Sequence, residues 1–306
     1  MADLVLVTGG TGFLGQQVCR VLRAHGHDAI PVHRVSGDLR HLETVHSLLK
    51  TAPWDAVVHL AYPGSRFGIE TSVKTPHTLA SDLIQMDLNV IDGCVALGIP
   101  KLLCVGSACA YPEHTTLPTD ESQLWAGYPE PVNAAYGLAK RTQLMLLQAA
   151  RQEHGLNGIH LILANMYGPG DRTQHVIPAL ITRLRQAVRD RTPLTVWGQP
   201  DVTRSFLYVE DAAEGIVRAL AAYDSPEPLN VVRTEETSME QLVTTLMDLL
   251  GIWVDVRYDA TKPTGHRRRC FSDTRLREAL GWVPPTPLRE GLRATLDWHL
   301  REVPLD

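Results

Sequence analysis

The sequence has few cysteines, and their spacing is too irregular to indicate a disulfide-rich or zinc-binding protein. There are five of them, an odd number without regular spacing, and the chain has neither a C-x-x-C pair nor a dense cluster of histidine and cysteine. The composition therefore predicts no disulfide framework and no metal site. Free thiols are typical of a reducing compartment, so we expect a cytoplasmic protein.

Long apolar runs and long basic runs are also missing. No apolar stretch approaches the roughly 20 residues that a membrane-spanning helix needs, and the first residues, MADLVLVTGGTGFLG, lack the features of a signal peptide. The formal net charge is -5, and the densest basic cluster is HRRR at 266–269. We therefore expect neither a membrane nor a nucleic acid as a partner.

What the sequence does contain is an alternation of strand-like and helix-like segments. Short apolar runs alternate with segments of helical periodicity through the first half of the chain, and residues 158–168 read as one further strand. This order predicts an α/β fold with a doubly wound parallel sheet and helices on both faces. The apolar runs are 3–9, 28–34, 55–61 and 101–107, and the helical segments are 13–26, 42–52, 83–98 and 133–155.

A glycine-rich turn joins the first predicted strand to the first predicted helix. The stretch VTGGTGFLG places Gly9, Gly12 and Gly15 at the spacing G-x-x-G-x-x-G. The first glycine permits a tight turn, the second lets the backbone approach a pyrophosphate, and the third allows close packing of helix on strand. The strand–turn–helix context predicts a Rossmann-type dinucleotide-binding domain. The alternative interpretation is a glycine turn without a ligand.

The pattern loosens after about residue 165, where prolines and short segments become frequent. We expect the Rossmann domain to comprise residues 1–165 and about 201–229, with the second piece rejoining the main sheet. A smaller C-terminal substrate-binding lobe would then comprise about 166–200 and 230–306.

The end of the second predicted strand indicates which dinucleotide binds. NAD-binding proteins usually carry Asp or Glu there, whereas NADP-binding proteins tend to carry Arg. Here the strand ends with His33 and Arg34 and has no acid at its tip. This favours NADP over NAD, unless Arg34 is a solvated loop charge. The other residues expected to line the cofactor are Thr11, Phe13, Leu14, Asp38, Leu39, Leu60 and Ala61.

Three polar residues form a candidate catalytic set. Tyr136 and Lys140, in AAYGLAK, are four apart on one predicted helix and so project from the same face. A nearby lysine cation favours the phenolate and is expected to lower the pKa of the tyrosine. Such a tyrosine exchanges a proton with a substrate oxygen while hydride passes between carbon and nicotinamide. Ser107, at the end of an intervening strand, would hydrogen-bond the same oxygen.

Several further motifs resemble the GDP-L-fucose synthases, a family of the extended short-chain dehydrogenase/reductase superfamily, over nearly the whole chain. The resemblance implies a homodimer that epimerises C3 and C5 of GDP-4-keto-6-deoxy-mannose and then reduces C4 with NADPH. The motifs are GSACAYP, ESQLWAGYPEPVNAAYGLAK, NMYGPGD, HVIPALITRL, VWGQPDVTRSFLYVEDAAEGI and DATKPTGHRRRCFSDTRL.

The resemblance also assigns the epimerisation to a cysteine and a histidine. It makes Cys109 the base and His175 the acid, and the ordinary pKa values of cysteine, about 8.5, and histidine, about 6.5, suit such roles. The alternatives are a small buried thiol at Cys109 and a helix-capping ring at His175. Buried thiols are expected at Cys19, Cys94 and Cys104.

By the same resemblance, a set of cationic, aromatic and amide side chains binds the nucleotide and diphosphate. The alternative is that the arginines are solvated and the tryptophan is packed. The set consists of Asn165, Arg183, Trp197, Arg204 and Arg269.

The sequence departs from the family at three places. Thr11 stands where arginine is common, residues 61–77 do not follow the family's glycine-rich segment, and the stretch between YGPGD and HVIPAL is short. The last two border the expected sugar site, so a GDP-heptose is an alternative substrate. Two rival interpretations of the whole chain are a redox-neutral epimerase with retained NAD, similar to GDP-mannose 3,5-epimerase, and a non-catalytic dinucleotide-sensing module.

Overall fold

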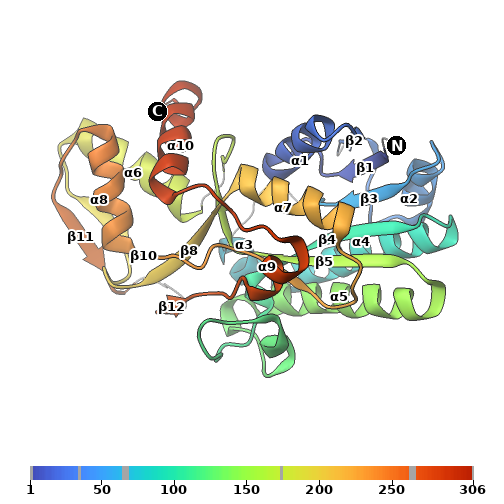
Figure 1. The fold of residues 1–306 in the computed structure, drawn as a ribbon. Helices are drawn as coiled ribbons and strands as arrows, with labels where there is room; N and C mark the ends of the chain where they lie inside the picture. The colour runs from blue at the N-terminus through green and yellow to red at the C-terminus, as the bar shows by residue number, and fades with distance from the viewer. Residues whose placement is uncertain (1–2, 34–35, 64–68, 173–174, 262–266, 305–306) are drawn as a thin grey trace.

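A parallel six-stranded sheet in the order β2-β1-β3-β4-β5-β9 forms the larger part of the molecule (Figure 1). The structure is a computed structural model that describes residues 3–33, 36–63, 69–172, 175–261 and 267–304. The central strands are apolar on both faces, as buried parallel strands must be. The strands are β1 (Leu4–Thr8), β2 (Asp28–Val32), β3 (Ala56–His59), β4 (Lys101–Ser107), β5 (Asn157–Leu163) and β9 (Leu229–Val231).

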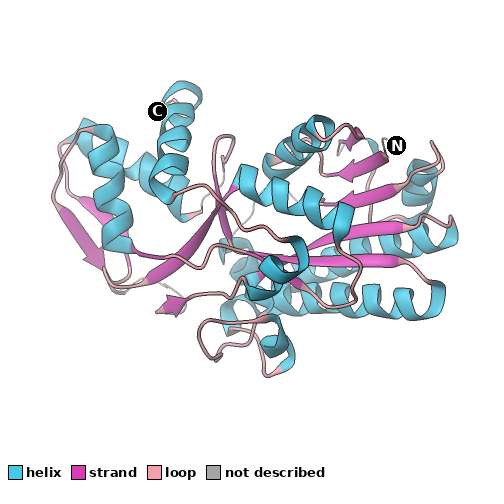
Figure 2. Ribbon diagram, in the orientation of Figure 1, coloured by secondary structure: helices cyan, strands magenta, loops and turns pink. Residues whose placement is uncertain are grey.

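Helices cover both faces of this sheet (Figure 2), which confirms the predicted doubly wound fold. One face is covered by α1 (Phe13–Ala24), α7 (Val209–Ala222) and α9 (Thr274–Leu280). The other is covered by α2 (Leu42–Leu49), α4 (Pro76–Ala96) and α5 (Ala134–His154).

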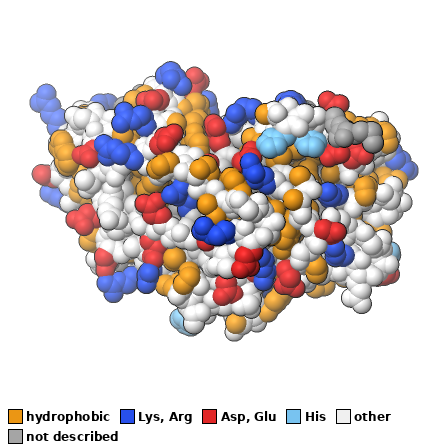
Figure 3. Space-filling model, in the orientation of Figure 1, with side chains coloured by type: hydrophobic (Ala, Val, Ile, Leu, Met, Phe, Trp, Pro, Cys, Tyr) orange, Lys and Arg blue, Asp and Glu red, His pale blue; other side chains and the backbone are white. Residues whose placement is uncertain are grey.

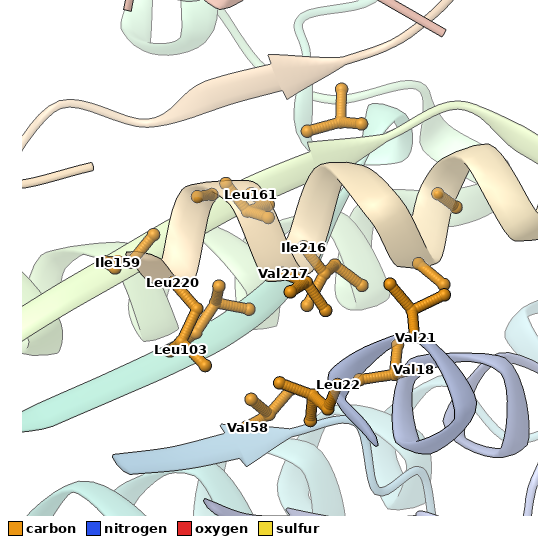
Figure 4. Packing of buried hydrophobic residues seen from close by; sticks show 14 of the residues in the cluster. Val18, Val21, Leu22, Val58, Leu103, Ile159, Leu161, Ile216, Val217 and Leu220 are labelled. Carbon is orange, nitrogen blue, oxygen red and sulfur yellow. The ribbon is translucent and has the colours of Figure 1, made fainter. Parts of the chain in front are cut away.

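The core beneath α1 and α7 shows why these segments are helical. Val18, Val21 and Leu22 of α1 recur at helical spacing, so they point from one side of the helix onto the sheet. Figure 4 shows them meeting side chains of α7 and of three strands. Those side chains are Ile216, Val217 and Leu220 of α7, Val58 of β3, Leu103 of β4, and Ile159 and Leu161 of β5.

A smaller group of elements lies beside the large sheet, with its own apolar core (Figure 1). Four short strands form one sheet, in which β6 (Asn165–Tyr167), β10 (Glu236–Ser238) and β12 (Arg268–Arg269) all pair with β8 (Thr203–Tyr208). β7 (Leu194–Trp197) pairs with β11 (Val256–Asp259). The helices here are α6 (Val176–Asp190), α8 (Met239–Leu250) and α10 (Leu288–Glu302).

Short elements connect the larger ones. They are the helix α3 (Ile69–Lys74) and the 3₁₀ helices η2 (Ala108–Ala110), η3 (Glu121–Trp125) and η4 (Pro131–Asn133).

Two features of the middle of the chain differ from the sequence prediction. The single strand predicted over 158–168 is wrong, because β5 belongs to the large sheet whereas β6 pairs with β8 in the small one. Both pieces are extended and apolar, so their periodicity does not record the change of sheet. Residues 201–229 also divide, since β8 lies in the small sheet while α7 covers the large one. The proposed lobe boundaries stay a prediction.

The described residues show how charge is distributed on one face and whether a helix could span a membrane. Acidic and basic side chains are interspersed on the face that Figure 3 shows. Within the described residues, every helix is too short or too polar to span a membrane. The same residues contain no group of three His, Cys, Asp or Glu side chains arranged to hold a metal ion.

Candidate active site

The glycine turn lies at the carboxyl edge of the large sheet, between β1 and α1, and is packed too tightly for larger residues. Gly9 has a φ of 67°, and a side chain there would place its Cβ 2.9 Å from the backbone of Leu60 and Ala61. A Cβ at Gly15 would lie 2.1 Å from the carbonyl oxygen of Gly9. Sequence reasoning missed Gly10, where a Cβ would lie 2.7 Å from the Cα of Pro31 in β2. The adjacent GG pair was the available signal.

The start of α1 is suited to an anion. Gly12 is its N-cap and provides no side-chain hydrogen bond, and the first turn, which contains Phe13 and Leu14, carries no acid. The amides and positive dipole end of a helix favour a phosphate at such a position. Together with the narrow glycine turn, this arrangement fits the pyrophosphate of a dinucleotide. The glycine turn and the first turn of α1 would hold the pyrophosphate.

The other predicted cofactor residues have varied surroundings. The backbone amides of Leu60 and Ala61 donate to the Thr8 hydroxyl at 3.2 and 3.3 Å, which places both residues beside the glycine turn. Thr11 is exposed, and its carbonyl accepts a hydrogen bond from Gln16.

Asp38 and Leu39 differ from each other in exposure. Hydrogen bonds from Arg40 lower the pKa of Asp38 to about 2, while the side chain of Leu39 is buried in the core. The decisive residue for NADP, Arg34, lies outside the described residues.

The structure brings the three predicted catalytic residues of the reduction together. Tyr136 and Lys140 are both buried on α5, and Ser107 ends β4. The expected lowering of the tyrosine pKa does not prevail. Burial raises the pKa of Tyr136, the neighbouring Cys109 raises it further, and the hydrogen bond with Ser107 opposes both. The phenol therefore keeps its proton at neutral pH, as a proton donor must.

Cys109 lies beside both Ser107 and Tyr136. Its backbone amide donates to the Ser107 hydroxyl at 3.2 Å, and its partly buried side chain packs against the cluster that contains Tyr136. Gly137 permits this approach, since a Cβ there would lie 2.4 Å from the Cys109 carbonyl oxygen. The other four cysteines are buried. Cys19, Cys94 and Cys104 were expected to be, and Cys270 is the fourth.

His175 lies on a different element, as the N-cap of α6. Its Nδ1 atom is 3.9 Å from Oδ2 of the buried Asp171. Burial lowers the pKa of His175, and the charge of Asp171 opposes that effect. His175 therefore takes the N-cap position through its backbone, and its side chain makes no capping hydrogen bond.

Two of the predicted nucleotide-binding residues are stacked at the surface of the smaller group of elements. The guanidinium of Arg183, on α6, lies 5.6 Å from the ring centroid of Trp197, on β7. Trp197 is 51% exposed. An exposed indole with a cation on it offers a platform for a planar ring.

Two other predicted residues, Arg204 and Arg269, are register partners on neighbouring parallel strands, β8 and β12. Arg269 donates to Glu130 at 2.8 Å. Burial and the charge of Arg269 lower the pKa of Arg204 to about 10, although Glu130 opposes this. The remaining predicted residue, Asn165 on β6, donates to the Ser205 carbonyl at 3.1 Å.

Comparisons with known proteins place the chain among nucleotide-sugar enzymes. The model of the NAD dependent epimerase/dehydratase family matches residues 5–232. The GDP-L-fucose synthase of Sinorhizobium fredii is 34% identical over 98% of this chain and 96% of its own. GDP-L-fucose synthase 1 of Arabidopsis thaliana is 31% identical over 98% and 94%. The GDP-L-fucose synthetase of Naegleria fowleri bound to NADP aligns with a TM-score of 0.87 at 26% identity, covering 97% of this chain and 94% of that one.

Proposed function

Since the chain belongs to the NAD dependent epimerase/dehydratase family, we propose that it is an NADPH-dependent epimerase/reductase that makes GDP-L-fucose from GDP-4-keto-6-deoxy-mannose. The observation that carries this proposal is the position of Cys109, which lies beside Ser107 and against the Tyr136 cluster. A reductase alone needs only Ser, Tyr and Lys. A thiol at the same point supplies a base for the carbon next to the carbonyl.

The reduction uses a protonated phenol. NADPH, when bound, supplies the hydride for C4. Ser107 and Tyr136 bind the C4 oxygen, and Tyr136 gives it a proton as negative charge develops there. The raised pKa of Tyr136 keeps that proton available, and the cation of Lys140 stabilises the phenolate that remains.

The epimerisation uses the thiol and the imidazole before reduction occurs. The C4 ketone acidifies the hydrogens on C3 and C5, and Ser107 and Tyr136 stabilise the enolate oxygen through hydrogen bonds. Cys109 takes the proton from one face of the sugar ring and His175 returns one to the other. The charge of Asp171 opposes the effect of burial on the pKa of His175 and so favours the imidazolium that donates this proton.

The nucleotide end of the substrate would lie on the smaller group of elements. Arg204 and Arg269 carry two positive charges against the one carboxylate of Glu130, which suits a diphosphate. The Trp197 and Arg183 stack suits the guanine ring.

The test is to incubate the protein with NADPH and GDP-4-keto-6-deoxy-mannose in deuterated water and to identify the product by NMR. We expect GDP-L-fucose, deuterium at C3 and C5, and one NADPH oxidised per product. Cys109→Ser should abolish the exchange, because a hydroxyl has a far higher pKa, while NADPH binding survives. Unlabelled product, or product without NADPH oxidation, would contradict the proposal. Full epimerase activity in Cys109→Ser would return that residue to a packing role.

We also propose that the enzyme is a cytoplasmic homodimer whose interface is formed by α4 and α5. The five free cysteines fit a reducing compartment. Met145, on α5, is 46% exposed, as a residue at a subunit interface is in an isolated chain. Light scattering should give twice the mass of one chain, and Met145→Asp should halve it. A monomer at micromolar concentration would refute the dimer.

A further inference from the structure

A chain of buried polar side chains runs beneath the Tyr136–Lys140 pair and is not explained by the proposed chemistry so far. The Thr8 hydroxyl is 2.7 Å from Nδ1 of His59, and Nε2 of His59 is 3.0 Å from Oδ1 of Asp87. Oδ2 of Asp87 is 3.7 Å from Nζ of Lys140. The four residues come from β1, β3, α4 and α5 and are at most 6% exposed.

The hydrogen bonds of Thr8 determine the direction of the chain. The Thr8 oxygen accepts from the amides of Leu60 and Ala61, so its own proton points to Nδ1 of His59. The neutral imidazole then carries its proton on Nε2 and donates it to Asp87. Asp87 is thereby held as a carboxylate, in one orientation.

Among the described residues, Lys140 is the one lysine or arginine that lies beside the carboxylate of Asp87. Burial by itself would raise the pKa of Asp87, but attraction to Lys140 and the hydrogen bond from His59 outweigh burial and lower it. A hydrogen bond from Gln143 of α5 also lowers this pKa, and the ion-pair partner of Oδ2 of Asp87 is the ammonium of Lys140 at 3.7 Å. A buried charge without such a partner would be costly.

The other titratable groups near the pair do not replace either partner. Burial and the charge of Lys140 lower the pKa of His160, on β5, to about 3, so that ring stays neutral. Burial raises the pKa of Cys104, on β4, and of Tyr62, after β3, so both keep their protons. Cys109, on η2, packs against the cluster that contains Tyr136.

We propose that Asp87, held by His59 and Thr8, is a positioning residue that keeps Lys140 charged and fixes its ammonium beside Tyr136. The inference rests on the proposed reductase function. The same chain connects the lysine to the cofactor turn, because the amides that bind Thr8 belong to Leu60 and Ala61, whose backbone is packed against Gly9. One network therefore positions the proton donor relative to the dinucleotide.

The experiment compares Asp87→Asn with the unaltered protein in ketone reduction across a range of pH. The asparagine keeps the shape and still accepts from His59, but it carries no charge. Without the anion, Tyr136, whose pKa Asp87 raises, should lose its proton at lower pH. The basic limb of the kcat profile should therefore move down by about one pH unit or more. We expect kcat to fall roughly 10- to 100-fold, less than when an acid–base group is removed, while KM for the GDP-sugar and NADPH affinity change less than about twofold.

Two further variants separate positioning from folding. Asn89→Ala is the matched control, because Asn89 is buried on the same helix and donates to the Leu39 carbonyl at 2.9 Å. It should lower the unfolding temperature and leave the basic limb in place. If Asp87→Asn does not fold, His59→Leu removes the donor to Asp87 and should shift the limb in the same direction by less. His59→Gln, which can donate again, should restore it.

The outcomes distinguish this inference from the proposed function. If the unaltered protein reduces no GDP-4-keto sugar, the proposed function fails. If the unaltered protein is active and Asp87→Asn has an unshifted basic limb, the positioning role is wrong. A shift of equal size in Asn89→Ala would also overturn it.

Discussion

The two ends of the candidate site differ in how their charges are balanced. At the catalytic end, the ammonium of Lys140 faces the carboxylate of Asp87 in the interior, and both are almost completely buried. At the end proposed to bind the nucleotide, Arg204 and Arg269 lie near the carboxylate of Glu130. Counted over these described side chains alone, the first arrangement is neutral, whereas the second has one positive charge in excess.

This difference indicates what each end does. A pre-balanced pair keeps its geometry and protonation before and after substrate binds, which suits proton transfer. Burial and, after it, the charge of Arg269 lower the pKa of Arg204, and an arriving anion would offset both effects. Under the proposed function, the catalytic end would be organised in advance, and the nucleotide end would gain affinity from its own electrostatic imbalance.

The largest effect should come from removing the proton donor at the balanced end. Tyr136→Phe should lower ketone reduction by about 10²- to 10⁴-fold, because the phenol supplies the proton to the C4 oxygen. NADPH binding and deuterium exchange at C3 or C5 should remain measurable. Tyr128→Phe is the control, since Tyr128 is 64% exposed. Equal loss of exchange and reduction would show that the two chemistries share one acid–base group.

At the unbalanced end, Arg204→Met should raise KM for the GDP-sugar by about 10- to 100-fold and leave kcat nearly unchanged, because a buried charge for the diphosphate is lost. Steady-state kinetics at two salt concentrations measure this, and the variant should depend less on salt. Arg189→Met is the control, because Arg189 pairs with Asp190 at the surface of α6. A fall in kcat alone would place Arg204 at the catalytic end instead.

The glycine turn belongs to neither end, and a substitution there tests whether its packing is as tight as the structure indicates. Gly15→Ala places a methyl group 2.1 Å from the Gly9 carbonyl, so the turn must open at a cost of about 1 to 3 kcal/mol in the free energy of unfolding. NADPH affinity should fall with it. Chemical denaturation and cofactor titration give the two values. Arg20→Ala, which removes the exposed ion pair between Arg20 on the same helix and Glu210 on α7, should change stability by about 0 to 1 kcal/mol. Unchanged NADPH affinity in Gly15→Ala would contradict the role of the turn.

At acid pH, a buried histidine near the balanced end is expected to affect stability. Burial holds the pKa of His160 at about 3, below its ordinary value of about 6.5, so the unfolded chain binds a proton there that the folded chain does not. Stability is therefore expected to fall as pH drops from about 6.5 towards 3, by up to about 1.4 kcal/mol per pH unit from this group.

His160→Leu should remove that contribution and flatten the pH dependence of unfolding between pH values of about 5 and 6. Denaturant unfolding at several pH values measures it. His154→Gln, at the exposed end of α5, is the control and should leave the slope unchanged. The same slope in His160→Leu would mean that other groups cause the acid sensitivity.

The sequence by itself determined the parts of this protein that depend on local spacing. The glycines at 9, 12 and 15, the Tyr136 and Lys140 pair one helical turn apart, and Cys109 two residues after Ser107 are all fixed by short stretches of chain. Such stretches carry their geometry with them, because a turn, a helix and a strand end have fixed repeat distances. The alternating periodicity likewise indicated the doubly wound sheet.

Only the tertiary structure decided which distant residues meet. His59 and Asp87 are separated by 28 positions and Glu130 and Arg269 by 139, and no spacing rule relates them. The sequence pattern also did not show that the chain passes from the large sheet at β5 to the small sheet at β6, because both segments are extended. The pKa of Tyr136 moved against the sequence expectation because burial raises it more than the hydrogen bond with Ser107 lowers it. Strand order and burial depend on how the whole chain packs, which a linear pattern of residue types does not contain.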